Sequence, residues 1–189
     1  MRNDNNRWRN NYRLHFYGLK DGVHDVSFPI ERSFFDNFPV DDIFGSRMTV
    51  NIELTKNDRH LHLKMVFSGA LLVECGVSAE RFWMNQSFES ELIAKFGEHT
   101  DTDDYEVWTI DRGAHHIDLA DYFFETIVVN LPLRRINPDV VNGQKDSDVY
   151  QAYLDYLNKQ QESKDEEPKP DEDNIDPRWQ ALKTLKQDK

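Results

Sequence analysis

Two neighbouring segments of the chain alternate strictly between hydrophobic and polar residues. The hydrophobic positions are Met48, Val50, Ile52 and Leu54 in the first segment, and Leu61, Leu63, Met65 and Phe67 in the second. Successive side chains of a strand point to opposite faces of its sheet, so this period of two predicts two strands that each bury one face. The polar residues 56–59 between them predict a hairpin turn.

Five further segments have the composition of strands, because they are rich in aliphatic, aromatic and β-branched residues and are bounded by glycine or polar residues. They are residues 12–19, 24–29, 70–75, 81–96 and 105–110. The segment 81–96 is expected to be anchored by Phe82, Met84, Phe88, Leu92 and Ile93. Together these segments predict an antiparallel sheet of about six strands that can curl toward a barrel, with a meander of about four strands at its centre.

Helical spacing replaces the alternation after Gly113. Asp118 is placed to cap a helix over residues 118–131, which Pro132 ends. One face of this helix carries Leu119, Tyr122, Phe123, Ile127 and Leu131. Shorter helices are expected over residues 33–38, 148–157 and 176–187. A sheet followed by helices predicts an α+β fold in which the 118–131 helix covers one face of the sheet.

Composition divides the chain into four parts. Residues 1–11 contain Trp8 as their only large hydrophobic side chain and are expected to form a flexible basic tail. Residues 12–157 are expected to form a single α+β domain. Residues 158–175 are expected to be a disordered acidic linker, because residues 158–174 include no hydrophobic side chain that could be buried. The short helix over residues 176–187 follows this linker.

The formal net charge of −12 is unevenly distributed. Residues 1–14 and 177–189 each carry +3, whereas residues 15–161 carry −12 and residues 162–176 carry −6. The acidic body disfavours a broad, nonspecific nucleic-acid-binding surface, but the basic ends are able to reach RNA. The sequence has neither a run of about 18 hydrophobic residues nor the hydrophobic segment of a secretory signal, so we expect a cytoplasmic protein.

The sequence contains no recognised catalytic motif. It lacks a glycine-rich phosphate loop and the Gly-x-Ser-x-Gly motif. His60 and His62 share the polar side of the hairpin, while the adjacent His115 and His116 would point to opposite sides of a strand. The single cysteine, Cys75, excludes an internal disulfide and ends a hydrophobic strand, where we expect it to be buried. We therefore expect no catalytic residue, no metal site and no cofactor.

The predicted terminal helix is a candidate binding element. Five of its residues combine a hydrophobic stripe with basic neighbours: Arg178, Trp179, Leu182, Leu185 and Lys186. A lone helix of this length is only marginally stable in water, so it must dock either on its own domain or on a partner. The sequence leaves both possibilities open.

Residues 72–82, 104–132 and 176–186 together resemble, in order and spacing, the bacterial DUF177 family, also called the YceD family. The positions that match the family motifs are Cys75, Asp118, Leu119, Glu125, Pro132, Asp176 and Pro177. The resemblance extends over about residues 12–187. Its most specific parts are the Asp-Pro-Arg-Trp element that begins at Asp176 and the Ile-Asp-Leu helix that ends at Leu-Pro.

The resemblance implies a non-enzymatic role, because the family is described as large ribosomal RNA subunit accumulation proteins. It implies a function in accumulating 23S rRNA and the large subunit, with a large-subunit ribosomal protein or pre-ribosomal RNA as partner and with no membrane or small-molecule cofactor. Many members read Cys-x-x-Cys after the central strand and carry further cysteines after the Leu-Pro. Here Ser78 stands at the second cysteine position, so the chain resembles a variant without that pair.

Three functions remain open at this stage. An accessory factor in ribosome biogenesis is favoured by the resemblance, and its acidic body would attract basic ribosomal proteins. The alternative is a small-ligand-binding protein with a barrel-like cavity, which the many aromatic residues suggest. A nuclease acting through Asp101, Asp103 and Asp104 is least favoured, because no base, nucleophile or metal set accompanies them.

Overall fold

The computed structural model describes residues 4–97, 107–144 and 147–165. Contacts between residues divide the chain into two compact units, Met1–Asn137 and Pro138–Lys189. This boundary differs from the single domain expected over residues 12–157, because residues 138–157 group with the second unit.

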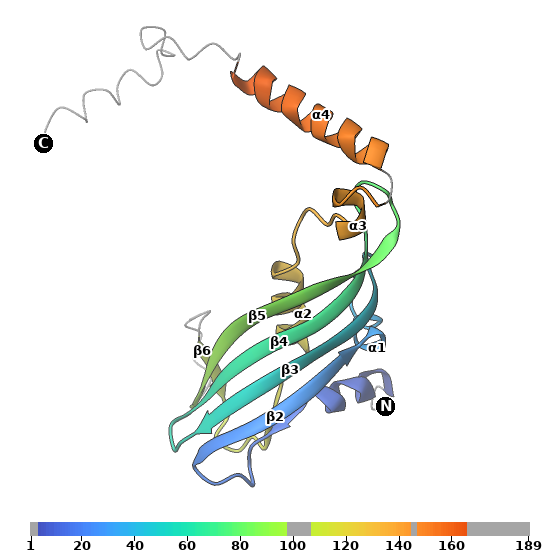
Figure 1. Ribbon diagram of the computed structural model, residues 1–189. Coiled ribbons are helices and arrows are strands. Elements are labelled where there is room, and N and C mark those ends of the chain that lie inside the picture. The colour runs from blue at the N-terminus through green and yellow to red at the C-terminus, as the bar shows by residue number, and fades with distance from the viewer. Residues whose placement is uncertain (1–3, 98–106, 145–146, 166–189) are drawn as a thin grey trace, which may run out of the picture. The chain divides into compact units, whose positions relative to one another are not determined.

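The first unit is built on a five-stranded main sheet with the order β2-β3-β4-β5-β6 (Figure 1). Its strands are β2 (Gly22–Glu31), β3 (Ile43–Lys56), β4 (His60–Glu74), β5 (Arg81–Phe96) and β6 (Val107–Ile110). The first four strands form the predicted antiparallel meander, whereas β6 runs parallel to β5. The α+β class is therefore confirmed, but the sheet is mixed and open and does not close into a barrel.

A second, two-stranded sheet pairs β1 (Arg13–His15) with β7 (His116–Asp118) in antiparallel register. The residues of β1 belong to the segment 12–19, which the sequence placed in the main sheet. This segment instead pairs with a strand about 100 residues later in the chain.

The predicted hairpin joins β3 to β4 at Asn57, whose side-chain oxygen accepts the backbone N–H groups of Arg59 and His60 at 2.9 Å each. Two strands predicted over residues 61–67 and 70–75 are in fact one continuous strand, β4. Gly69 lies between them with φ of +140° and stays in register with both neighbouring strands. A residue without a Cβ adopts this backbone conformation readily, so the strand continues through the glycine rather than ending at it.

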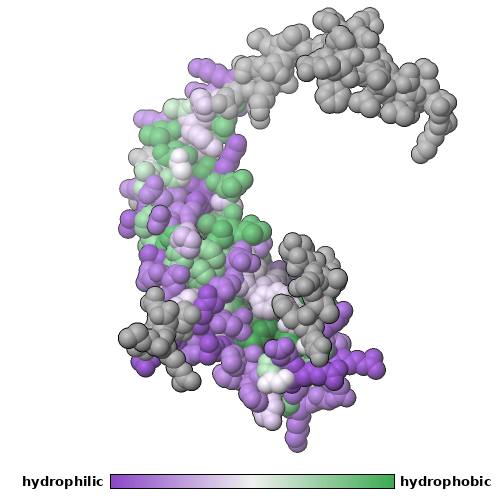
Figure 2. Space-filling view, turned by 180° about the vertical axis from the view of Figure 1, so that it is seen from behind, coloured by the Kyte–Doolittle hydropathy of each residue, from purple (hydrophilic) through white to green (hydrophobic). Residues whose placement is uncertain are grey.

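One face of the main sheet is covered by α2 (Ala120–Val129), which lies behind the sheet in Figure 1. The ring of Phe123 packs between Phe28 of β2 and Phe67 of β4, at ring-centroid distances of 5.5 and 5.9 Å. Figure 2 shows this covered side, where hydrophobic residues gather over α2 and the segment that follows it. The alternating residues predicted to be buried in β3 and β4 all lie in this core: Met48, Val50, Ile52, Leu54, Leu61, Leu63, Met65 and Phe67.

The helix α2 is two residues shorter at each end than the predicted helix over residues 118–131. The N-cap residue is Leu119, which makes no side-chain cap hydrogen bond, so the cap predicted at Asp118 is wrong by one residue; Asp118 lies just before it, and its Oδ1 accepts the backbone N–H of Ala120 at 3.1 Å. At the other end, the side-chain amide of Asn130 donates to the carbonyl oxygen of Thr126 at 2.9 Å, so the helix ends before Pro132.

The N-terminal segment differs from the flexible tail expected over residues 1–11. Asp4–Tyr12 form a 3₁₀-helix, η1, and the ring of Trp8 packs against Phe34 and Phe38, with centroids 6.1 and 5.4 Å apart. Phe34 belongs to the short helix α1 (Arg32–Phe35). Arg9 donates two hydrogen bonds to the carboxylate of Asp121 in the first turn of α2, at 2.9 and 2.7 Å. These long-range contacts anchor a segment whose own composition is polar.

The second unit contains α3 (Pro138–Val141) and α4 (Ser147–Asp165). The helix predicted over residues 148–157 is thus present, but it continues into the segment expected to be a disordered linker. Residues 158–165 include Lys, Gln and Glu, which favour the helix even without a hydrophobic face. Residues 166–175 of the expected linker and the helix predicted over residues 176–187 lie outside the described residues. No helix in the described ranges is long and hydrophobic enough to cross a membrane.

Candidate functional site

The face of the main sheet opposite α2 carries mostly polar side chains, and we call it the polar face. Strand register aligns these side chains in rows across β2, β3, β4 and β5. One row consists of Asp25, Glu53, Lys64 and Glu91, and the next consists of Ser27, Asn51, Val66 and Glu89. Residues far apart in the sequence are therefore brought into one surface.

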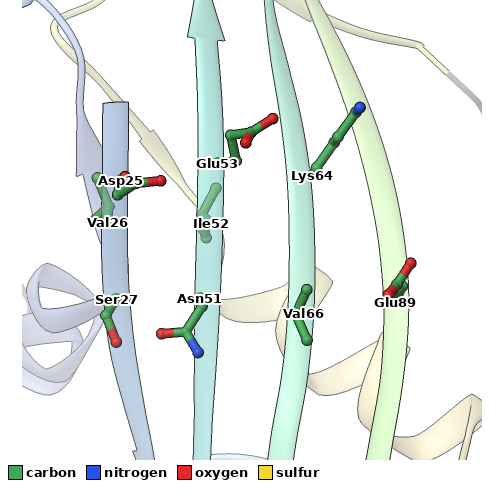
Figure 3. A pocket seen from close by; sticks show the side chains of 9 residues that line it. All are labelled: Asp25, Val26, Ser27, Asn51, Ile52, Glu53, Lys64, Val66 and Glu89. Carbon is green, nitrogen blue, oxygen red and sulfur yellow. The ribbon is translucent and has the colours of Figure 1, made fainter. Parts of the chain in front are cut away.

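These rows line an open groove of about 620 Å³, and the side chains of the two rows that Figure 3 labels come from four adjacent strands. Asp25, Glu53 and Glu89 have no ion-pair partner in the part of the chain that the structure describes. Asp25 and Glu53 are also direct cross-strand neighbours. Like charges in this position destabilise a sheet, so this end of the polar face is an acidic surface that favours cationic groups.

The other end of the polar face holds two arginines that lie over aromatic rings. The guanidinium carbon of Arg47 is 4.2 Å from the ring centroid of Trp83, and that of Arg81 is 3.7 Å from the ring centroid of Phe44. Trp83 is 40% exposed. We call these four residues the stacked-arginine cluster.

An irregularity in β3 shapes this cluster. The register shifts between Ile43, which pairs with Val73, and Gly45, which pairs with Leu72, so Phe44 is an extra residue on this strand. Such a β-bulge changes the direction of a side chain, and here the ring of Phe44 lies beneath Arg81.

The sequence patterns did not predict the stacked-arginine cluster, and the core position predicted for Ile93 of β5 is wrong. They assigned both Leu92 and Ile93 to the core, but adjacent residues of a strand face opposite sides, and Ile93 is 37% exposed on the polar face. The cluster could have been found from the alternation of buried and exposed residues along β3 and β5, because this alternation assigns Arg47 and Trp83 to the solvent side of their strands. A tryptophan at such a position indicates a surface with a role beyond the core.

Cys75 follows β4 and its side chain is buried, as predicted. Its Sγ accepts the backbone N–H of Ser78 at 3.5 Å and that of Asn137 at 3.4 Å. The backbone N–H of Gly76 also donates to the carbonyl oxygen of Arg135 at 2.8 Å. Hydrogen bonds at and beside this sulfur thus join the segment after β4 to residues 135–137.

The pKa of the Cys75 thiol is lowered from its ordinary value. Burial acts to raise this pKa, but hydrogen bonds from Ser78 and from the backbones of Asn137 and Val77 favour the thiolate and outweigh it. An unfolded thiol has a pKa of about 8.5. The Cys75 thiolate therefore contributes nothing to the stability of the fold well below the folded-state pKa. Its contribution grows as the pH rises through that pKa and is complete above about 8.5.

We predict that Cys75→Ala lowers the free energy of unfolding at pH 7 by about 1–3 kcal/mol, because the N–H groups of Ser78 and Asn137 lose their acceptor. The difference from the wild type should widen between pH 7 and pH 9, as measured by urea unfolding. Cys75→Ser keeps an acceptor and should be less destabilised. A difference that shrinks with rising pH would contradict the lowered pKa.

The family-motif positions at α2 have different surroundings. Asp118 lies just before the N-cap of α2, and its Oδ1 accepts the backbone N–H of Ala120 and lies 3.6 Å from a guanidinium nitrogen of Arg9. Leu119 is fully buried and its backbone N–H donates to the carbonyl oxygen of Tyr12 at 3.1 Å. Glu125 and Pro132 are exposed. The remaining motif positions and the candidate partner-binding residues lie outside the described residues and stay predictions: Asp176, Pro177, Arg178, Trp179, Leu182, Leu185 and Lys186.

The histidines do not form a shared site. His60 and His62 are partly exposed on the polar face, where His62 Nε2 lies 3.2 Å from a carboxylate oxygen of Glu91. His115 and His116 make ring contacts with different residues. Within the described ranges, no group of three or more histidine, cysteine or acidic residues is arranged to hold a metal ion. Residues 101–104, with the three aspartates of the nuclease hypothesis, lie outside these ranges.

Comparison with protein-family models matches residues 63–186 to YceD, described as large ribosomal RNA subunit accumulation protein. The match is shorter than the resemblance expected over residues 12–187, but it covers more than half of the chain and begins within β4. No curated protein and no solved structure matched the chain. The protein accordingly belongs to the YceD family, whose description assigns it a role in accumulation of the large ribosomal subunit.

Proposed function

We propose that the protein is a non-enzymatic accessory factor in ribosome biogenesis. It supports accumulation of 23S rRNA and the large subunit by binding a large-subunit ribosomal protein or pre-ribosomal RNA. The observation that carries this proposal is the family match over residues 63–186. It is independent of the charge distribution, which supports the same conclusion.

The polar face supports a binding role because its two ends differ in chemistry. The groove end, with Asp25, Glu53 and Glu89, is complementary to the basic side chains that ribosomal proteins present. The other end offers the guanidinium groups of Arg47 and Arg81. A precursor of the large subunit contains both basic protein and anionic RNA, so it can satisfy both ends.

The alternative function, binding of a small ligand inside a barrel, loses its basis in this fold. The main sheet does not close, and the groove on the polar face is open to solvent. The described residues therefore favour a macromolecular partner over an enclosed ligand.

We expect the affinity-tagged full-length chain to co-sediment with large-subunit precursors from growing native cells. Precursor 23S rRNA and large-subunit proteins should be enriched over a tagged acidic control protein, and added salt should weaken the association because charged surfaces are screened. Sucrose-gradient fractions, prepared with and without added salt, are analysed by mass spectrometry for the proteins and by RNA sequencing for the rRNA. Recovery of neither component above the control would overturn the proposal.

A further inference from the structure

We propose that the stacked-arginine cluster is a contact site for single-stranded RNA. Bases of the RNA stack against the layered side chains of Arg47 on Trp83 and Arg81 on Phe44, while the guanidinium edges donate to phosphate oxygens. This inference rests on the proposed function and deepens it, because it names RNA as a direct partner and assigns the surface that binds it.

The cationic groups of the cluster are available to a ligand. Neither Arg47 nor Arg81 has a carboxylate partner within the part of the chain that the structure describes, and both side chains are exposed. Their direct cross-strand neighbours are Glu31 and Glu74, and neither forms an ion pair with them. Two unpaired arginines beside a tryptophan that is 40% exposed form a surface typical of recognition rather than of a solvated face.

Stacking on a ring leaves most of a guanidinium group free. The ring holds one face of the group through a cation–π contact, which orients the side chain. The opposite face remains open to a nucleic-acid base, and the N–H groups at the edge remain open to phosphate. Single-stranded RNA offers both an exposed base and a phosphate within one nucleotide, whereas a basic protein segment would meet two like charges here.

The backbone of β3 is adapted to this arrangement. A Cβ at Gly45 would lie 3.1 Å from Leu72 Cβ and 3.2 Å from Trp83 Cη2, so the glycine leaves room for the indole ring to lie over the strand. The adjacent bulge residue, Phe44, provides the ring beneath Arg81. Two adjacent residues of β3 therefore serve the two stacked pairs: Gly45 leaves room for Trp83, and Phe44 lies beneath Arg81.

The charge of the polar face limits where RNA can lie. Phosphates are repelled by the acidic rows around Glu53 and Glu89, which carry no arginine, so the RNA contact is confined to the arginine end. Glu31 and Glu74 offset the charges of Arg47 and Arg81 there, so charge contributes little to the affinity. Two phosphate contacts predict a shallow salt dependence, with a slope of about −1.4 in a plot of log K against log salt. Stacking, rather than charge alone, then supplies much of the affinity.

The test measures binding of a fluorescein-labelled 12-nucleotide single-stranded RNA to the full chain by fluorescence anisotropy. Trp83→Ala should weaken binding about two- to fivefold, because Arg47 loses the ring that orients its guanidinium group toward the RNA. Arg47→Lys and Arg81→Lys keep the charge but lose the planar group, and each should weaken binding about two- to fivefold. Because both lysine variants change only exposed side chains, they keep the test valid if Trp83→Ala fails to fold.

Two matched controls should leave binding unchanged. Ile93→Ala removes an exposed hydrophobic side chain from the same face of β5, and Arg59→Ala removes one positive charge from the exposed turn between β3 and β4. Equal binding by wild type, Trp83→Ala and both lysine variants would overturn the inference, as would failure of the wild type to bind the RNA. A loss of binding in Arg59→Ala equal to that in Arg47→Lys would also overturn it, because charge alone would then explain affinity.

Co-sedimentation with large-subunit precursors separates this inference from the proposed function. If the wild type co-sediments but does not bind the RNA, and Trp83→Ala weakens co-sedimentation, a protein occupies the cluster and the RNA inference fails while the proposed function stands. If the wild type binds the RNA but does not co-sediment, the proposed function fails and the RNA contact stands.

Discussion

Gly69→Ala is expected to lower the free energy of unfolding by about 3 kcal/mol or more. The residue has φ of +140°, a conformation that side chains with a Cβ rarely adopt. An added Cβ would lie 2.6 Å from the Cα of Met48 and closer still to the carbonyl oxygen of Arg47. Both atoms belong to the backbone of β3, so relief requires a shift of the central strand pair and not a change of rotamer. Urea unfolding monitored by circular dichroism measures the loss.

Two other glycines separate the causes of this effect. Gly22 has φ of +134°, and a Cβ added there would have no atom within 4 Å, so Gly22→Ala experiences backbone strain alone. Gly18 has neither a positive φ nor a close neighbour, so Gly18→Ala should be nearly neutral. The expected order of destabilisation is Gly69→Ala, then Gly22→Ala, then Gly18→Ala. If Gly69→Ala and Gly22→Ala lowered the free energy of unfolding equally, the close contact of the added Cβ with β3 would contribute nothing to the destabilisation.

Phe123→Ala is expected to destabilise the protein by about 3–5 kcal/mol, because it leaves a cavity at the centre of the covered face. The ring is fully buried and packs against Phe28 and Phe67, so it joins α2 to both β2 and β4. Hydrogen exchange should report faster opening of α2, and urea unfolding should give the overall loss.

The neighbouring residue is a suitable control for this substitution. Phe124 is half-buried and stacks on Phe38 with a centroid distance of 4.1 Å, so Phe124→Ala should cost clearly less than Phe123→Ala. Val129 is 83% exposed, and Val129→Ala should be nearly neutral. Losses of similar size for Phe123→Ala and Phe124→Ala would contradict the assignment of Phe123 to the centre of the core.

The parts of the fold that the sequence predicted correctly depend on local patterns. Alternation in β3 and β4 predicts their buried face because the sheet imposes the same period on every strand. The turn at Asn57 is likewise local, since its side chain bonds backbone groups within three residues, and the hydrogen bond of Asp118 to Ala120 marks the start of α2 to within a residue of the predicted cap. The observed start and end of α2 each lie two residues inside the predicted helix over residues 118–131, because single hydrogen bonds decide where a helix ends.

The features that the sequence did not predict depend on contacts between distant residues. Trp8 lies in a polar segment, and η1 is anchored by the packing of Trp8 on Phe34 and Phe38 and by the hydrogen bonds of Arg9 to Asp121. The pairing of β1 with β7 joins segments about 100 residues apart, which no periodicity within either segment encodes. The stacked-arginine cluster similarly requires the register of β3, β4 and β5 together with a bulge at Phe44.

An open sheet leaves strand edges that can pair with another protein chain, and this is a common route to aggregation. Among the strands that the structure describes, β2 and β6 each have a neighbour on one side only. In β2, Pro29 has no backbone N–H to offer to an incoming strand, and the exposed Asp25 and Glu31 add negative charge. β6 spans only Val107–Ile110 and is too short to serve as a template. The protein can thus keep a broad, solvent-exposed sheet while resisting edge-to-edge association of its β2 and β6 edges with its own copies.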